Sequence, residues 1–104
     1  MKVELLYFDG CPSYERLLPR LSELVAGADP DAEVELRRVE SIKAAERERF
    51  LGSPTVRIDG VDVDPGAADR EDFGLKCRLY RTEEGTSGLP PERWIRDALG
   101  ESKR

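Results

Sequence analysis

A chain of 104 residues is long enough to enclose one hydrophobic core and too short for two, so we expect a single domain over residues 1–104. Its net charge of −5 and its lack of a dense basic stripe argue against binding to nucleic acid. They argue equally against binding to an anionic membrane surface, and no apolar run approaches the roughly 20 residues that would span a bilayer. Histidine is absent, which excludes histidine-based general-base catalysis and removes the commonest metal ligand.

The first segment, residues 3–8, is apolar at nearly every position, as expected of a central strand that is covered on both faces. Glu4 interrupts it and no small-residue cleavage site follows, so the pattern predicts a strand and not a signal peptide. The expected location is therefore the cytoplasm. Two cysteines in that compartment are more often reactive, metal-binding or buried than joined in a structural disulfide.

Helical spacing begins after Gly10. Apolar side chains recur at intervals of three and four residues, which predicts an amphipathic helix whose buried stripe is Cys11, Tyr14, Leu18, Leu21 and Val25. Pro12 suits the first turn of that helix, whereas Pro19 lies inside it and should bend it by removing one backbone hydrogen bond. Gly27 ends the helix, and the alternation over residues 34–39 predicts a second strand.

A short helix over residues 42–51 should follow, with Ser41 as its N-cap and Gly52 closing it in a left-handed conformation. Residues 55–58 and 61–63 then predict two strands, since the Asp-Gly pair between them is among the strongest hairpin signals. The acids of this region fit no calcium-binding spacing and are interpreted as solvated loop and turn residues: Asp59, Asp62, Asp64 and Asp69.

The C-terminal part begins with a polar stretch, residues 64–74, which predicts a surface loop. Residues 75–80 then alternate, so that one face should point toward the core and the other toward solvent. The inward set is Leu75, Cys77 and Leu79, and the outward set is Lys76, Arg78 and Tyr80. After a turn over residues 83–88, Pro90 and Pro91 open a final helix, on which we expect Trp94 to be largely buried.

The order of these elements is strand, helix, strand, helix, hairpin, helix. The initial strand-helix-strand crossover implies a parallel pair, and the hairpin adds antiparallel strands. The sequence therefore predicts an α/β fold in which a four-stranded mixed sheet is flanked by helices.

Cys11 at a strand-to-helix junction, Ser53-Pro54-Thr55 just before a strand, and Pro19 eight residues after Cys11 together resemble the thioredoxin-like superfamily. The resemblance implies a three-layer sandwich, a nucleophilic cysteine that opens the first core helix, and a cis-proline loop packed against it. Residues 6–12, 52–55 and 74–80 look more closely like a group of small bacterial thioredoxin-like proteins. Some of that group are named beside alkylmercury lyase or mercury-resistance genes, and some as selenoproteins.

The chain departs from thioredoxins in one informative way. The usual Cys-x-x-Cys motif is replaced by Cys11-Pro12-Ser13-Tyr14, which puts a tyrosine at the position of the resolving cysteine. Dithiol turnover within the motif is therefore excluded. Cys77 is the only other sulfur that could resolve a mixed disulfide, and it could equally be a core cysteine. A bridge between the two would need Cα atoms no more than about 7 Å apart.

Two hypotheses follow, and neither requires a cofactor. In the first, the chain is a thiol–disulfide redox protein: Cys11 is activated by the helix N-terminus and Cys77 is the distal resolving cysteine. Its substrate would be a protein or small-molecule thiol or disulfide in a groove framed by a cis Ser53–Pro54 bond, with the Ser53 backbone free to pair with it. The substrate-binding residues are then Pro12, Tyr14, Ser53, Pro54 and Thr55.

The alternative is a non-catalytic thioredoxin-like binding module that uses the same groove for a protein partner or a thiophilic metal. Two thiolates suit a soft ion such as Hg(II) or Cu(I). They are too few for a closed structural zinc site, and no histidine is present to complete one, so we expect no resident metal.

Overall fold

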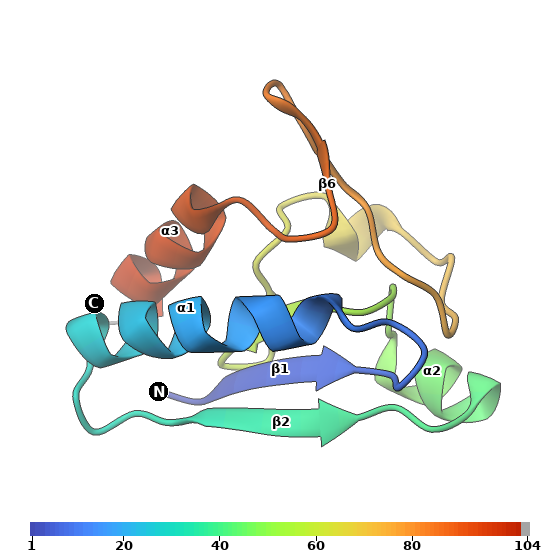
Figure 1. Cartoon of the computed structure of the whole chain (residues 1–104), viewed down its shortest axis with the longest axis horizontal. Coiled ribbons are helices and arrows are strands. Elements are labelled where there is room, and N and C mark those ends of the chain that lie inside the picture. The colour runs from blue at the N-terminus through green and yellow to red at the C-terminus, as the bar shows by residue number, and fades with distance from the viewer. Residues whose placement is uncertain (103–104) are drawn as a thin grey trace.

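The computed structural model describes residues 1–102, which form a four-stranded mixed sheet, three α-helices and a separate two-stranded hairpin (Figure 1). The elements in chain order are β1 (Val3–Tyr7), α1 (Ser13–Ala28), β2 (Val34–Arg38), α2 (Ile42–Glu48), β3 (Thr55–Ile58), β4 (Val61–Asp62), the 3-10 turn η1 (Ala67–Asp69), β5 (Tyr80–Thr82), β6 (Gly85–Ser87) and α3 (Glu92–Ser102).

The main sheet has the strand order β2-β1-β3-β4. β1 pairs in parallel with β2 and antiparallel with β3, and β3 pairs antiparallel with β4. Asp59 and Gly60 join the last two strands with φ values of 53° and 84°, as a two-residue type I′ turn requires. The predicted parallel crossover and the predicted hairpin are both confirmed.

Alternating side chains of β1 point to opposite faces of the sheet, and both faces are covered. Leu5 belongs to a core shared with α1 and α3, which includes Leu17, Leu21, Val25, Ile95 and Leu99. Leu6 belongs to a smaller core with Val39, Ala45 and Phe50, which includes α2. The α/β prediction is therefore confirmed, with two helices against one face and one against the other.

Two helix boundaries differ from the sequence prediction. α1 begins at Ser13, so Cys11 lies just before the helix and not in its first turn, while Pro19 lies inside it as expected. α2 starts at the predicted cap, since the Ser41 hydroxyl accepts the Ala44 N–H at 3.0 Å. It ends at Glu48, earlier than predicted, because Arg49 itself adopts the left-handed conformation that was expected of Gly52.

The predicted faces of residues 75–80 are wrong from Cys77 onward, although Leu75 packs against the smaller core as predicted. Arg78 and Tyr80 are buried, with 1% and 2% of their surface exposed, whereas Cys77 and Leu79 are exposed. The reversal has a physical cause, because both buried side chains find partners: Arg78 is ion-paired, and the Tyr80 hydroxyl donates to the Pro54 carbonyl at 2.5 Å. The alternating pattern was present, but its polar members face inward.

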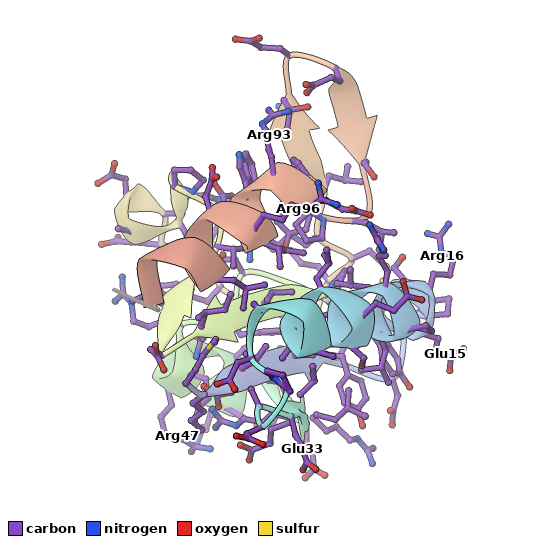
Figure 2. The ribbon with its side chains drawn as sticks, turned by 90° about the vertical axis from the view of Figure 1, so that its left-hand side faces the viewer. Glu15, Arg16, Glu33, Arg47, Arg93 and Arg96 are labelled. Atoms are coloured by element: carbon purple, nitrogen blue, oxygen red, sulfur yellow. The ribbon has the colours of Figure 1, made fainter. Side chains whose placement is uncertain are left out.

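The C-terminal part contains one element that the sequence did not predict. Residues 83–88 form the tip and return strand of the β5–β6 hairpin, which projects away from the layered body in both views (Figures 1 and 2). Charged side chains labelled on α1, α2 and α3 point outward into solvent in Figure 2. Trp94 is only partly buried, its ring edge meeting Tyr80 with centroids 6.1 Å apart, so it is less enclosed than predicted.

Candidate thiol site

The candidate site is built around Cys11, which ends the turn between β1 and α1. Its N–H donates to the Phe8 carbonyl at 3.3 Å, which closes the turn. Gly10 makes this turn possible, because a Cβ there would lie 2.5 Å from the Phe8 ring. Only 1% of Cys11 is exposed, so its thiol sits beneath the surface.

The loop before β3 lies against this thiol. The Ser53–Pro54 peptide bond is cis, as predicted, and it lies beside the Cys11 end of α1, since the Cys11 thiol donates to the Ser53 carbonyl at 3.5 Å. The Ser13 hydroxyl lies 3.7 Å from the same sulfur. β1, α1 and the loop before β3 therefore converge on one buried sulfur.

A third segment completes the site and brings the second cysteine to it. Ser53 and Cys77 form an isolated parallel bridge. The Ser53 N–H donates to the Lys76 carbonyl and the Arg78 N–H donates to the Ser53 carbonyl, each at 2.8 Å. The expectation that the Ser53 backbone is free for an extended substrate is therefore wrong, because the chain's own residues 76–78, hereafter the docked segment, already occupy it.

Gly52 allows the docked segment to approach so closely. Its φ is +126°, and a Cβ at this position would lie 3.0 Å from both the Arg78 Cβ and the Lys76 carbonyl oxygen. A side chain here would meet backbone as well as side-chain atoms, and the conformation itself disfavours any residue other than glycine. Gly52 thus has a local role that differs from the helix-closing role predicted for it.

Both cysteines meet at Ser53, because the Cys11 thiol donates to the Ser53 carbonyl and Cys77 pairs with Ser53 in the isolated bridge, so the structure brings Cys11 and Cys77 together. Burial by itself raises the pKa of the Cys11 thiol, but hydrogen bonds from Cys77, from the Ser13 N–H and hydroxyl and from Ser53 outweigh it, and the pKa falls below its ordinary value. The pKa of Cys77 is raised, because its hydrogen bond to Cys11 holds its proton and burial adds to the effect. Of the two thiols, Cys11 therefore loses its proton more readily.

The other residues predicted to contact substrate lie in two groups. Ser53, Pro54 and Thr55 are buried under the docked segment, and the Thr55 hydroxyl donates to the Gly52 carbonyl at 2.6 Å. Pro12 is exposed at the start of α1. Tyr14 is half-buried and stacks on Tyr7 with ring centroids 4.1 Å apart, which forms a small aromatic wall at the start of α1.

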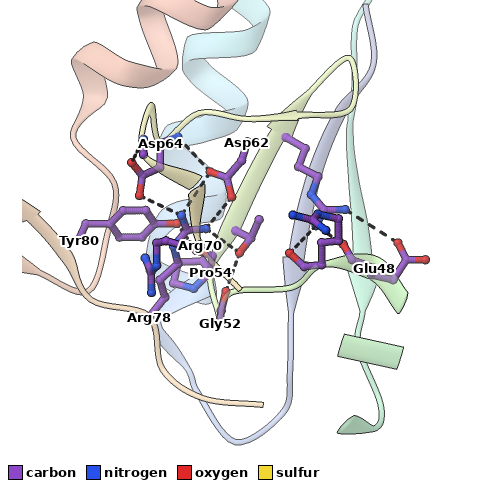
Figure 3. Close-up of polar contacts among 12 residues, drawn as sticks. Glu48, Gly52, Pro54, Asp62, Asp64, Arg70, Arg78 and Tyr80 are labelled. Carbon is purple, nitrogen blue, oxygen red and sulfur yellow. Dashed lines mark hydrogen bonds and ion pairs between the residues drawn. The ribbon is translucent and has the colours of Figure 1, made fainter. Parts of the chain in front are cut away.

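A buried arginine that sequence reasoning missed anchors the docked segment (Figure 3). The Arg78 guanidinium is fully enclosed and reaches Asp62 at 2.8 Å and Asp64 at 3.1 Å. It also donates to the Thr55 hydroxyl at 3.0 Å and lies 4.5 Å from the centre of the Tyr80 ring. The interpretation of Asp62 and Asp64 as solvated loop residues is therefore wrong. Two aspartates two residues apart, and an arginine between Cys77 and Leu79, were the available signal.

We compared the chain with known protein families, with curated proteins and with solved structures. None of the three comparisons finds a match. Within residues 1–102, no cluster of three or more cysteine, aspartate or glutamate side chains is arranged to hold a metal ion, and no helix is long and apolar enough to cross a membrane.

Proposed function

We propose that the chain is a thioredoxin-like domain that acts as a thiol–disulfide redox protein, with Cys11 and Cys77 as its redox pair. The strand order of the mixed sheet, the position of Cys11 between β1 and α1, and the packing of residues 52–55 against that cysteine support the fold assignment. A thiol at the start of a helix, with its pKa lowered, is the arrangement that activates cysteine for sulfur exchange.

The observation that carries the proposal is that Cys11 and Cys77 meet at the same residue, since the Cys11 thiol donates to the Ser53 carbonyl and Cys77 pairs with Ser53. The chain lacks the usual second cysteine of the motif, so turnover without an external thiol needs a distal sulfur within reach of Cys11. Cys77 is brought there by two backbone hydrogen bonds between Ser53 and the docked segment. A contact specified by backbone pairing is a property of the fold and not a chance approach of two flexible side chains.

The difference in exposure between the two cysteines indicates which one reacts first with substrate. Cys77 is exposed and meets an incoming disulfide, whereas Cys11 is buried behind it. Cys77 gives its proton to the Cys11 thiolate and attacks one sulfur of the substrate disulfide, forming a mixed disulfide and releasing one substrate thiolate. That thiolate takes the proton from Cys11, which then attacks the Cys77 sulfur, forms the Cys11–Cys77 disulfide and releases the second substrate thiolate.

In this cycle the protein loses two electrons and the substrate disulfide gains them. Cys11 remains the nucleophile of the step that closes the protein disulfide, while the first contact with substrate passes to Cys77. The same two steps run backward when a thiol reduces the oxidised protein, and Cys11, with its lower pKa, is then the better leaving group.

The proposal is tested by mild oxidation of the purified protein followed by peptide mapping with mass spectrometry. The wild type should yield an intramolecular Cys11–Cys77 disulfide. When a small disulfide is added, the reaction of Cys77→Ser or of Cys11→Ser should stop at the mixed disulfide, because neither variant has a second cysteine to resolve it. Two thiols that stay free under oxidant in the folded wild type would contradict the proposal.

The alternative binding function has one observation in its favour, which is that two adjacent sulfurs suffice for a soft ion that prefers few ligands. Anaerobic titration with Cu(I) or Hg(II) should then give one tight equivalent per chain, lost in either Cys→Ser variant. A reversible Cys11–Cys77 disulfide that turns over with a substrate disulfide would favour the redox function.

A further inference from the structure

The position where an extended polypeptide would pair with the site is already filled. Both backbone groups of Ser53 are hydrogen-bonded to the docked segment, and strand addition by a partner requires such groups to be unpaired. Arg78, the last residue of the docked segment, also anchors it, because its guanidinium is enclosed by Asp62, Asp64 and the Tyr80 ring. A polypeptide partner would have to break these contacts before it could pair.

A small molecule, in contrast, can reach the exposed sulfur directly. Cys77 lines a surface cavity of about 490 Å³, which lies in the size range of small-molecule sites. Most of its wall is charged: the cations are Arg70, Lys76, Arg78 and Arg81, and the carboxylates are Asp64 and Asp72. Figure 3 shows Arg70 and Arg78 close together beside Asp64.

Most of these charges pair within the cavity wall, and one cation is left over. Asp72 forms ion pairs with both Arg70, at 2.7 Å, and Lys76, at 2.8 Å. Arg78 forms ion pairs with Asp64, which lines the cavity, and with Asp62, which does not. Arg81 is exposed and forms no ion pair with any residue in the part of the chain that the structure describes. The cavity is thus net positive on a chain whose net charge is −5.

We infer that the exchange partner of this redox pair is a small thiol, or its disulfide, that carries an anionic group such as a carboxylate or sulfonate. The inference rests on the proposed function and names its substrate class. The anionic group pairs with Arg81, which lines the same cavity as Cys77, so the small molecule is held in the cavity that contains the reactive sulfur. A positive cavity raises the local concentration of such an anion and disfavours a cationic thiol.

The exchange that reduces the oxidised protein balances as follows. One small thiolate attacks the Cys77 sulfur, the Cys11–Cys77 bond breaks, and Cys11 leaves with the electron pair as a thiolate. A second small thiolate attacks the small-molecule sulfur of the mixed disulfide, releasing the small disulfide and a Cys77 thiolate that takes up a proton. Two small thiols are oxidised and one protein disulfide is reduced.

The test measures how fast three thiols of similar size reduce the oxidised protein: 2-mercaptoethanesulfonate, 2-mercaptoethanol and 2-aminoethanethiol. Each rate is divided by the rate of the same thiol with a small neutral disulfide, which removes differences in intrinsic reactivity. The anionic thiol should exceed the cationic one by about tenfold, and added salt should reduce that ratio.

Arg81→Gln should remove most of this preference, because it deletes the unpaired cation of the cavity. Arg47→Gln is the matched control, since it makes the same change in charge at an exposed position on α2, outside the cavity (Figure 2). Equal normalised rates for the three thiols, or equal effects of the two substitutions, would overturn the inference and leave the redox proposal intact. So would an unstructured cysteine peptide that reacts faster than all three. Failure of the disulfide to form at all would instead refute the proposed function.

Discussion

Arg78 anchors the docked segment, and its burial was not predicted from the sequence. A buried guanidinium is costly unless its charge and its donors are satisfied. Here two carboxylates, one hydroxyl and an aromatic ring surround it. These partners come from the start of β3, from the end of β4 and the loop after it, and from β5, so the arginine joins the docked segment to the edge of the sheet.

Arg78→Met should lower the free energy of unfolding by about 3 kcal/mol, because it leaves two largely buried carboxylates without their cation. Arg93→Met is the control. Its ion pair with Glu84 is half exposed or more on both sides and should contribute less than about 1 kcal/mol. Denaturant unfolding of both variants checks the difference. Adding Asp62→Asn and Asp64→Asn to Arg78→Met should recover part of the loss, and no recovery would show that packing and not charge is responsible.

The second residue-scale prediction concerns the charge on Cys11. Ser13→Ala removes a hydroxyl that lies 3.7 Å from the sulfur and helps to lower the Cys11 pKa, so the pKa should rise toward its ordinary value. Thiolate absorbance followed against pH in a Cys77→Ser background measures it. Ser22→Ala, at an exposed position of the same helix, should leave the pKa unchanged.

The same lowered pKa makes stability depend on pH. The unfolded chain binds the Cys11 proton at pH values where the folded chain has released it, so this contribution is fully present above the ordinary thiol value of 9.0 and is lost as the pH falls through the folded pKa. Cys77 has a raised pKa, so its contribution to the free energy of unfolding decreases as the pH rises above 9.0. Ser13→Ala should flatten the rise in stability between the folded pKa of Cys11 and its ordinary value, and an unchanged slope would contradict the assigned role of the hydroxyl.

At the scale of elements, the predictions that succeeded depend on neighbours in the sequence. The apolar run of β1, the cap at Ser41 and the turn at Asp59-Gly60 each specify local geometry, and each is found. The predictions that failed depend on partners distant in the chain. The faces of residues 77–80 were inverted because hydrophobicity favours Cys77 and Leu79 inside, while the aspartates that satisfy Arg78 lie 14 and 16 positions away.

The candidate site divides in the same way. Cys11 and the residues 53–55 were found because their places between elements resemble the thioredoxin-like pattern, and the contact between Cys11 and Ser53 is the one that the resemblance implies. The docked segment was not found, because its pairing with Ser53 depends on a tertiary fit at Gly52. No periodicity in the sequence encodes that fit.

Gly52→Ala tests this fit at the level of the element. The added methyl group would meet the Lys76 carbonyl and Arg78 at 3.0 Å, so the docked segment should shift away from Ser53. We expect the protection of the Arg78 and Ser53 amides from hydrogen exchange to fall and alkylation of Cys11 to accelerate. Gly74→Ala is the matched control, because its Cβ meets nothing within 4 Å and its φ is ordinary. Equal protection in the two variants would show that the segment does not depend on Gly52.

At the scale of the whole molecule, a Cys11–Cys77 bond would link the start of α1 to the docked segment, which follows all four strands of the main sheet in the sequence. The chain enclosed between the two cysteines includes α1, β2, α2, β3 and β4, so the bond would restrict most of the unfolded chain. For a loop of roughly 65 residues the chain-entropy model gives about 4 kcal/mol of stabilisation, provided that the folded geometry accepts the bond without distortion. Both cysteines already contact Ser53, so we expect that little rearrangement is needed.

Oxidised wild-type protein should therefore unfold at a higher denaturant concentration than reduced protein, with a difference of about 2–4 kcal/mol in the free energy of unfolding. Cys77→Ser, treated with oxidant in the same way, should show no such difference, which controls for other oxidative damage. If the fold instead had to distort to form the bond, the oxidised wild type would be no more stable than the reduced form, or less so. Such a disulfide would be strained and easily reduced. The sign of the difference in unfolding free energy between the oxidised and reduced forms thus separates a protein that its disulfide stabilises from one whose strained disulfide readily oxidises other thiols.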